Sequence, residues 1–263
     1  MKKIVLSIAI IMAAVAAQAQ TVVEDKVIDN QTIRYVTDKI SCEELTTILA
    51  FVPVDITLYD GEEGAVEISY PLAERPYINF GIENYEGKKA LIIGRNGYVD
   101  IPKKTLLSDK VPIYVRVSTS QLKTISGHED TMLRIERDKF ADDLTLKNGF
   151  VMSIVTKSIT ALNSLTILNH GTMTCHVKEW NTASVEVFNN GYLYMHGATT
   201  AKNIVFKSAK DGINDVCLDV DCESLTIFSR GKGVLRYRGK ADDVQVSARG
   251  KRCTIYTSEL NAE

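Results

Sequence analysis

The segment Leu144-Thr145-Leu146-Lys147-Asn148-Gly149 decides the fold, because similar segments recur along the C-terminal half of the chain. The later copies begin, in order, at Leu165, Val185, Ile204, Leu225 and Val244, so their starts lie 21, 20, 19, 21 and 19 residues apart. An earlier copy begins at Leu122, 22 residues before Leu144. Apolar and polar residues alternate within each copy, which is typical of a half-buried β-strand. The segments therefore predict a repetitive structure made of short strands.

Each repeat also has small residues at two fixed positions. A glycine ends the first strand, at Gly127, Gly149, Gly171, Gly191, Gly231 and Gly250. After a second alternating segment, such as residues 173–177, another small residue precedes the next repeat, at Ala141, Ala161, Ala183, Ala201, Cys222 and Ala241. Glycine suits a recurrent tight corner. Because the alanine position accepts little volume, we interpret Cys222 as a buried structural thiol.

These repeats predict an all-β fold, a single-stranded parallel β-helix with coils of about 20 residues. A propeller blade needs about 40 residues, and the signature of leucine-rich repeats is missing. One coil cannot bury its own apolar face, whereas coils stacked about 4.8 Å apart can.

Asn148, Asn169 and Asn189 share strand parity with the apolar residues of their repeats. We expect them to point inward and to hydrogen-bond one another as a ladder along the stack, with Ser208 and Ser229 in the next equivalent positions. The alternative is that they are ordinary turn asparagines that precede glycine.

Residues 1–19 are predicted to be a signal peptide. Lys2 and Lys3 precede an apolar run over residues 4–17, and Ala17-Gln18-Ala19 provides a cleavage site. We expect residues 20–263 to form a single β-helix domain, with irregular coils and a cap over 20–120 and regular coils over 121–263. Within it, residues 21–45 are expected to pair along the first coil or to cover it. An exported chain would be periplasmic, displayed on the outer surface or secreted, and no later apolar stretch predicts a membrane span.

The composition excludes several classes of protein. The 263 residues include 45% hydrophobic and 24% charged residues and have a formal net charge of −2, which argues against a disordered chain or a nucleic-acid-binding protein. The five cysteines are few for a chain of this length, and their odd number leaves at least one unpaired, so a disulfide scaffold is not predicted. Cys217 and Cys222 are nevertheless close enough in sequence to pair. The spacing of zinc ligands is absent, and we predict no cofactor.

Three segments resemble one known family. They are Cys42-Glu-Glu-Leu-Thr-Thr-Ile48 with Val54-Asp-Ile-Thr-Leu-Tyr-Asp-Gly61, the stretch from Val111 to Gly127, and the stretch from Gly239 to Gly250. In order and spacing they are similar to the "putative auto-transporter adhesin, head GIN domain" family over nearly the whole mature chain. The resemblance implies a secreted, right-handed parallel β-helix of Gram-negative bacteria with a role in cell adhesion. It implies no catalytic residues.

Outward-facing residues of successive coils should also form lanes, by which we mean rows of residues at equivalent positions. If Leu218, Leu235 and Cys253 stack inward, one lane contains His176, His196, Asp221, Arg238 and Tyr256, and the next contains Thr174, Tyr194, Asp219, Arg236 and Thr254. We interpret His176, His196, Asp221, Arg238 and Tyr194 as candidates for a shallow surface that binds a glycan or a protein. The alternatives are a solvated ladder of paired charges and a metal site made by two histidines and a carboxylate. A third lane of Leu168, Phe188 and Phe228 is apolar, so we expect it to be covered or to contact a partner.

The sequence lacks a nucleophile elbow, a zinc-protease motif, a P-loop and a dinucleotide-binding motif, so we predict no catalytic residues. We predict a non-catalytic binding or adhesion module that presents a repetitive surface to an unidentified glycan or protein at the cell envelope. The alternative is a carbohydrate-active β-helix enzyme, a polysaccharide lyase or hydrolase, with Asp215, Asp219 and Asp221 as clustered carboxylates. Such an enzyme should have a deep cleft with converging carboxylates.

Overall fold

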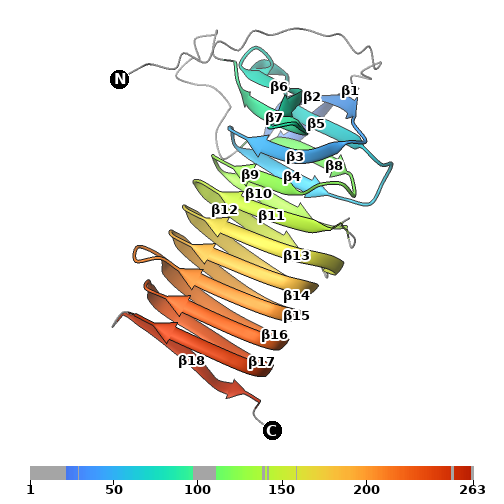
Figure 1. The fold of residues 1–263 in the computed structure, drawn as a ribbon. Coiled ribbons are helices and arrows are strands. Elements are labelled where there is room, and N and C mark those ends of the chain that lie inside the picture. The colour runs from blue at the N-terminus through green and yellow to red at the C-terminus, as the bar shows by residue number, and fades with distance from the viewer. Residues whose placement is uncertain are drawn as a thin grey trace, which may run out of the picture.

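The chain winds into a parallel β-solenoid of about six turns with roughly 21 residues in each turn (Figure 1). The computed structural model describes residues 22–28, 30–96, 111–137, 140, 142–157, 159–249 and 252–261. The predicted signal peptide of residues 1–19 lies outside the described residues. The β-solenoid predicted from the repeat is confirmed.

The regular coils stack in the register that the repeat predicts. Leu144 pairs with Leu165, and the same row continues through Val185, Ile204, Leu225 and Val244. The strands that build these coils are β11 (Asp143–Asn148), β12 (Val151–Thr156), β13 (Ile159–Asn169), β14 (Thr172–Asn189), β15 (Tyr192–Ser208), β16 (Ile213–Ser229), β17 (Lys232–Ala248) and β18 (Cys253–Leu260).

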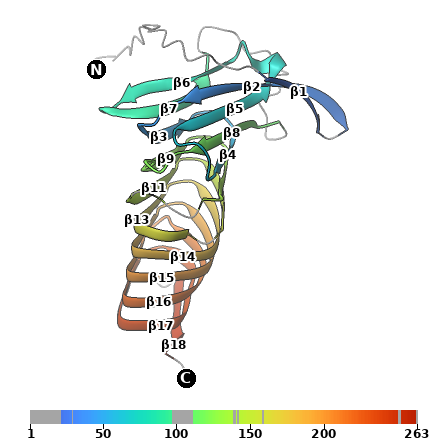
Figure 2. The same ribbon diagram turned by 90° about the vertical axis from the view of Figure 1, so that its right-hand side faces the viewer.

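From β14 to β17 each strand is long enough to bend around one edge of the solenoid (Figure 2). We call the layer that contains β10 (Thr131–Ile135), β12, the first halves of β14–β17, and β18 the first sheet. The layer that contains β9 (Thr124–Gly127), β11, β13 and the second halves of β14–β17 is the second sheet. Inward-facing residues of the two layers form one continuous apolar core.

The N-terminal coils do not follow one another in space as they do in sequence. The coil made by β3 (Leu45–Ala50) and β4 (Val54–Leu58) lies between two others. On one side it pairs with β9 and β10, and on the other with β7 (Lys88–Arg95) and β8 (Ile113–Ser118). The coil of β7 and β8 therefore lies nearer the N-terminal end of the stack than the coil of β3 and β4, which precedes it in sequence.

Antiparallel strands close this end of the stack (Figure 2). β1 (Val22–Ile28) pairs with β2 (Gln31–Ser41), β2 with β5 (Ala65–Pro71), and β5 with β8. β6 (Ile78–Tyr85) forms a hairpin with β7, and a short 3-10 turn, η1 (Leu72–Glu74), follows β5. The expectation that residues 21–45 cover the first coil is met in part, because β1 and β2 belong to this cap but β3 is itself part of a coil.

Three expected positions need correction. Thr124 pairs with Thr145, so the earliest copy is 21 residues upstream, not the 22 that a start at Leu122 gives. In the lane of small residues Ala201, Cys222 and Ala241 follow one another, but Thr182 and not Ala183 precedes them. The β-bulge within β14 shifts the strand by one position there. Leu162 and not Ala161 pairs with Thr182 in the preceding coil. Position 141, the remaining expected member, lies outside the described residues.

The asparagines lie inside the stack. Asn148 Nδ2 donates to Asn169 Oδ1, and Asn169 Nδ2 donates to Asn189 Oδ1, each at 2.8 Å. Asn189 Nδ2 donates in turn to Asn214 Oδ1 at 2.8 Å. All four side chains are buried. Asn214, which follows the corner glycine Gly212 by two residues, was not expected in this ladder.

All five cysteines are free thiols. Cys217 and Cys222 lie five residues apart in the single strand β16. At about 3.3 Å per residue, their Cα atoms are well beyond the roughly 7 Å that a disulfide can span. The possible pairing of these two residues is therefore not present in this structure.

Candidate binding surface

The outer side of the first sheet has an aromatic strip across the regular coils. His176 pairs with His196, and the lane continues through Cys217, Arg236 and Tyr256. The lane beside it contains Thr174, Tyr194, Asp215, Val234 and Thr254. These side chains point outward because the residues between them, such as Cys175, Met195 and Val216, are buried in the core.

Ring contacts organise the strip. The Tyr194 ring stacks on His196 with centroids 4.1 Å apart and an angle of 12° between the planes. His176 meets Tyr194 edge-on at 5.5 Å, and His196 Nε2 lies 3.5 Å from Asp215 Oδ1. The Arg236 guanidinium lies 5.3 Å from the centre of the Tyr256 ring. These contacts hold flat aromatic faces in a fixed geometry on an open surface.

Exposed apolar side chains widen this surface. Large hydrophobic residues with more than a third of their surface exposed occur on the same outer side, at Val151, Val155, Tyr192, Ile213, Val234 and Tyr256. Contiguous apolar surface of this kind marks sites of interaction more often than an isolated exposed residue does. We call the two lanes together with these flanking residues the aromatic strip.

Three predicted members of the two lanes, Asp219, Asp221 and Arg238, lie elsewhere, and Arg236 lies in the first lane and not in the second. The expected lanes were wrong at these positions. Asp221 lies between Thr200 and Lys240, and Arg238 lies between Asp219 and Glu259. Arg238 forms a two-point ion pair with Asp219, from Nε to Oδ1 and from Nη2 to Oδ2, the second at 2.8 Å. This pair raises the pKa of the Arg238 guanidinium.

For Asp221 the error has a physical origin in one corner. Between Ser208 and Ile213 the turn is two residues longer than the equivalent turn from Asn189 to Tyr192. Gly212 is the corner glycine of this longer turn, and counting from it places Cys217, not Asp221, beside His196. The expected inward stack of Leu218, Leu235 and Cys253 is not one row. Leu218 lies against Tyr237, Leu235 against Val216 and Ile255, and Cys253 against Gly233.

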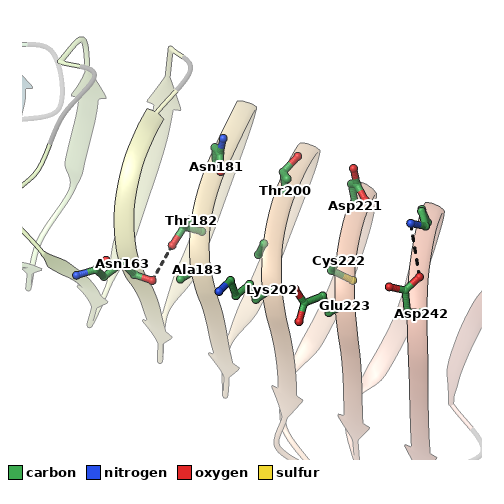
Figure 3. A pocket seen from close by; sticks show the side chains of 12 residues that line it. Asn163, Asn181, Thr182, Ala183, Thr200, Lys202, Asp221, Cys222, Glu223 and Asp242 are labelled. Atoms are coloured by element: carbon green, nitrogen blue, oxygen red, sulfur yellow. Dashed lines mark hydrogen bonds and ion pairs between the residues drawn. The ribbon is translucent and has the colours of Figure 1, made fainter.

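Asp221 instead lines a polar groove where the strands bend from the first sheet to the second (Figure 3). The groove has a volume of about 670 Å³ and crosses β13 to β17. One of its lanes contains Asn181, Thr200, Asp221 and Lys240, and beside it lie Ala183, Lys202, Glu223 and Asp242. We call it the corner groove. Sequence reasoning found only Asp221 among these residues, although counting from Gly212 would have revealed the lane.

The hydrogen bonds and charged groups of the groove are spread over several coils and do not converge on one point. Lys240 Nζ lies 3.6 Å from Asp242 Oδ1, and Thr182 Oγ1 donates to the Asn163 carbonyl at 3.1 Å (Figure 3). Cys222 is buried beneath the groove. Burial raises the pKa of its thiol to about 11, with a smaller contribution from the carboxylates of Asp221 and Asp242. A thiol with this pKa is protonated near neutral pH and is a poor nucleophile.

The carboxylates considered for catalysis do not converge. Asp219 is paired with Arg238, Asp215 lies beside His196, and Asp221 lies in the corner groove. Among the described residues, no three His, Cys, Asp or Glu side chains come together as metal ligands.

The apolar lane on the second sheet is interrupted. Leu168 pairs with Phe188, but Lys207 separates Phe188 from Phe228. Lys207 forms an ion pair with Glu186, and Phe228 is 48% exposed. The lane is therefore a mixed surface, and the predicted cover does not extend over Phe228.

The chain folds as a β-solenoid with open outer surfaces, and the comparisons agree on this fold. The chain resembles the solved structure of a "putative adhesin" from Parabacteroides distasonis ATCC 8503, with a TM-score of 0.62 and 15% identity over 85% of this chain and 97% of the other. It also resembles a "putative adhesin" from Bacteroides fragilis NCTC 9343, with a TM-score of 0.57 and 16% identity over 84% of this chain and 96% of the other.

A third similar structure is a "putative adhesin" from Parabacteroides merdae ATCC 43184, with a TM-score of 0.52 and 18% identity over 84% and 95% of the two chains. No family model and no curated protein matches the sequence. No helix in the described part of the chain has the length and hydropathy that a membrane span requires.

Proposed function

We propose that this protein is a non-catalytic, adhesion-type binding module of the cell envelope. In this proposal it is exported by the signal peptide and belongs to the head GIN domain family. A glycan or a protein partner lies along the aromatic strip and the adjoining corner groove. The observation that supports this most is the repetition of outward aromatic and polar side chains, coil after coil, in lanes that face open solvent.

The chemistry of the two surfaces suits an extended partner. Tyr194 and His196 offer flat aromatic faces, whereas the groove beside them offers amide, hydroxyl, carboxylate and ammonium groups. Lanes repeat about every 4.8 Å, so a long ligand can meet similar groups many times. Weak contacts that repeat in this way produce useful affinity without a deep pocket. The "putative adhesin" names of proteins with the same fold support an adhesive role.

A binding array of glycans and extracellular matrix proteins, probed with the purified mature chain, tests this proposal. Tyr194→Ala should weaken binding to the partner about tenfold, since exposed aromatic residues often dominate binding surfaces. Lys202→Ala in the corner groove should weaken it less. Phe228→Ala changes an exposed aromatic residue on the other sheet, so it is the control and should bind as the parent does.

Two results would contradict the proposal. One is binding that neither Tyr194→Ala nor Lys202→Ala changes. The other is cleavage of a polysaccharide in a calcium-dependent lyase or hydrolase assay, which would favour the enzyme interpretation with Asp215, Asp219 and Asp221.

A further inference from the structure

A separate hollow lies on the outer side of the second sheet, near the capped end. It has a volume of about 380 Å³, which is within the range of small-ligand sites. Residues from β3, β9 and β11 form its floor and one end, and the tip of the β6–β7 hairpin forms the other end. It shares no lining residue with the aromatic strip or the corner groove.

The floor of the hollow is recessed. In β3 the residues Ile48 and Ala50 point into the core, so Thr47 and Leu49 point outward. Outward-facing residues of an open sheet are normally well exposed, yet Thr47 and Leu49 are only 5% and 6% exposed. Ser126, which pairs with Leu49 in the next coil, is buried as well. The floor thus combines an apolar side chain with two hydroxyl groups.

One end is a fixed aromatic platform. The Phe51 ring stacks on His128 with centroids 4.6 Å apart and an angle of 12° between the planes. Ser126 Oγ lies within hydrogen-bond distance of His128 Nε2, at 3.1 Å, which holds the imidazole in this orientation. Phe51 keeps 44% of its surface exposed, so the platform is open to a ligand.

The other end is the turn of the β6–β7 hairpin. Glu86 and Gly87 have φ angles of 52° and 76°, as the tight turns of two-residue hairpins require. This turn places Tyr85 and Lys88 on the rim, near the start of β3, where Lys89 pairs with Leu45. Along β3 the hollow extends from Thr47 to Phe51, about 13 Å at the rise of a strand.

The charge of the hollow is positive. Lys88 and Lys147 line it together with a single carboxylate, that of Glu86. Neither lysine forms an ion pair with any residue that the structure describes. Lys147 follows Ser126 in the same lane, so one ammonium group lies beside the floor and the other lies at the hairpin tip.

We propose that this hollow binds a sugar residue that carries a carboxylate, such as a hexuronate within a longer glycan. The apolar face of a pyranose ring packs on the Phe51–His128 platform, as aromatic surfaces favour flat apolar partners. The ammonium group of Lys147 attracts the carboxylate of this sugar, and that of Lys88, at the other end of the hollow, attracts the carboxylate of a neighbouring sugar in the glycan. Hydroxyl groups of the sugar exchange hydrogen bonds with Thr124 and Ser126. The inference is independent of the aromatic strip, because the two sites lie on different sheets.

Titration calorimetry with tetragalacturonate and with its fully methyl-esterified form tests the proposal, because the two differ in charge but keep the same sugar rings. We expect the acidic form to bind at least tenfold more tightly, and this preference to shrink as salt is added. Phe51→Ala should weaken binding of both forms about tenfold. Lys147→Ala should weaken only the acidic form, and Lys88→Ala should do so to a similar degree.

The substituted residues are exposed, so each variant should keep the thermal midpoint of the parent. Phe228→Ala and Lys210→Ala change an exposed aromatic residue and an exposed lysine outside the hollow, the aromatic strip and the corner groove, so both should bind tetragalacturonate normally. Equal affinity for the two forms, no binding of either, or unchanged binding by Phe51→Ala or Lys147→Ala would overturn the proposal. Loss of binding in Tyr194→Ala would place the sugar on the aromatic strip, which would overturn this inference and leave the proposed function standing.

Discussion

At the scale of single residues, the buried asparagine side chains of the ladder are paired by the neighbouring coil, whereas the buried Ser229 hydroxyl has no partner among the described residues. Asn169 Nδ2 donates both to Asn189 Oδ1 and to the Tyr192 carbonyl, each at 2.8 Å. Its own Oδ1 accepts from Asn148. Burying an amide without such partners costs about 1–3 kcal/mol, so the ladder permits a polar row in an apolar core.

Replacing the middle member of the ladder should be costly. Asn169→Leu removes the side-chain acceptor of Asn148 Nδ2, which keeps its bond to the Thr172 carbonyl. It also removes one of the two donors to Asn189 Oδ1, which still accepts from the Gly191 N–H. We expect a loss of about 1–3 kcal/mol for each lost partner. Lys147→Ala, an outward change in the preceding coil, should alter stability by less than about 0.5 kcal/mol. Denaturant midpoints of the two variants and the parent provide the measurement. Small and equal shifts would show that the ladder contributes little.

Tyr237 presents the opposite case. Its side chain is completely buried, and its hydroxyl has no hydrogen-bond partner among the described residues. Burial also raises the pKa of this phenol, so it stays neutral. Tyr237→Phe removes a buried group without a partner, and we expect the free energy of unfolding to stay the same or to rise by about 1 kcal/mol.

A matched tyrosine sharpens this test. The Tyr70 hydroxyl donates to Asp38 Oδ2 at 2.7 Å, so Tyr70→Phe should lower stability by about 1.5–3 kcal/mol. Thermal or urea unfolding of both variants checks the prediction. A loss of stability in Tyr237→Phe as large as in Tyr70→Phe would mean that the Tyr237 hydroxyl is paired.

At the scale of elements, the sequence predicts the register of the regular coils but not the irregular turn or the order of the N-terminal coils. The alternation from Leu144 to Val244 gave the register of the second sheet, because inward apolar positions fix it. The longer turn at Gly212 led to the misplacement of Asp221, whereas Arg238 was misplaced although the count from Gly231 leads to Arg236. The hollow near Phe51 could not be predicted, since it needs the order of the N-terminal coils, which follows from non-local pairing of β3 with β7 and β9.

The lane of small residues leads to a prediction for Cys222. This residue lies between Ala201 and Ala241, and the lane accepts alanine on both sides. Cys222→Ala should therefore cost less than about 1.5 kcal/mol in a denaturant titration. At pH 8 the native Cys222 thiol should react with iodoacetamide more slowly than Cys217, which is partly exposed, because burial raises the pKa of Cys222 to about 11. Rapid alkylation of Cys222 in the native protein would contradict this.

At the scale of the whole molecule, the two ends of the stack differ. Antiparallel strands cover the first coils, and Tyr35 and Tyr70 of this cap are buried. At the other end, Val244 and Val246 continue the inward rows of Leu225 and Ile227 but are 37% and 47% exposed. Each coil of a solenoid is stabilised chiefly by its neighbours, so stability should depend on position along the stack.

Native-state hydrogen exchange should therefore reveal a gradient. Amides of β18 and of residues 243–248 have neighbours on one side only among the described residues, and we expect them to exchange fastest through local opening. Amides of β14, β15 and the first half of β16 lie between coils and should exchange slowest. Val246→Ala should speed amide exchange in the last coil and leave the exchange rates of β14 unchanged, because the last coil can open without disrupting the central coils. Uniform protection from β13 to β18 would instead indicate that the stack opens as one cooperative unit, and that the exposed last coil is as stable as the interior.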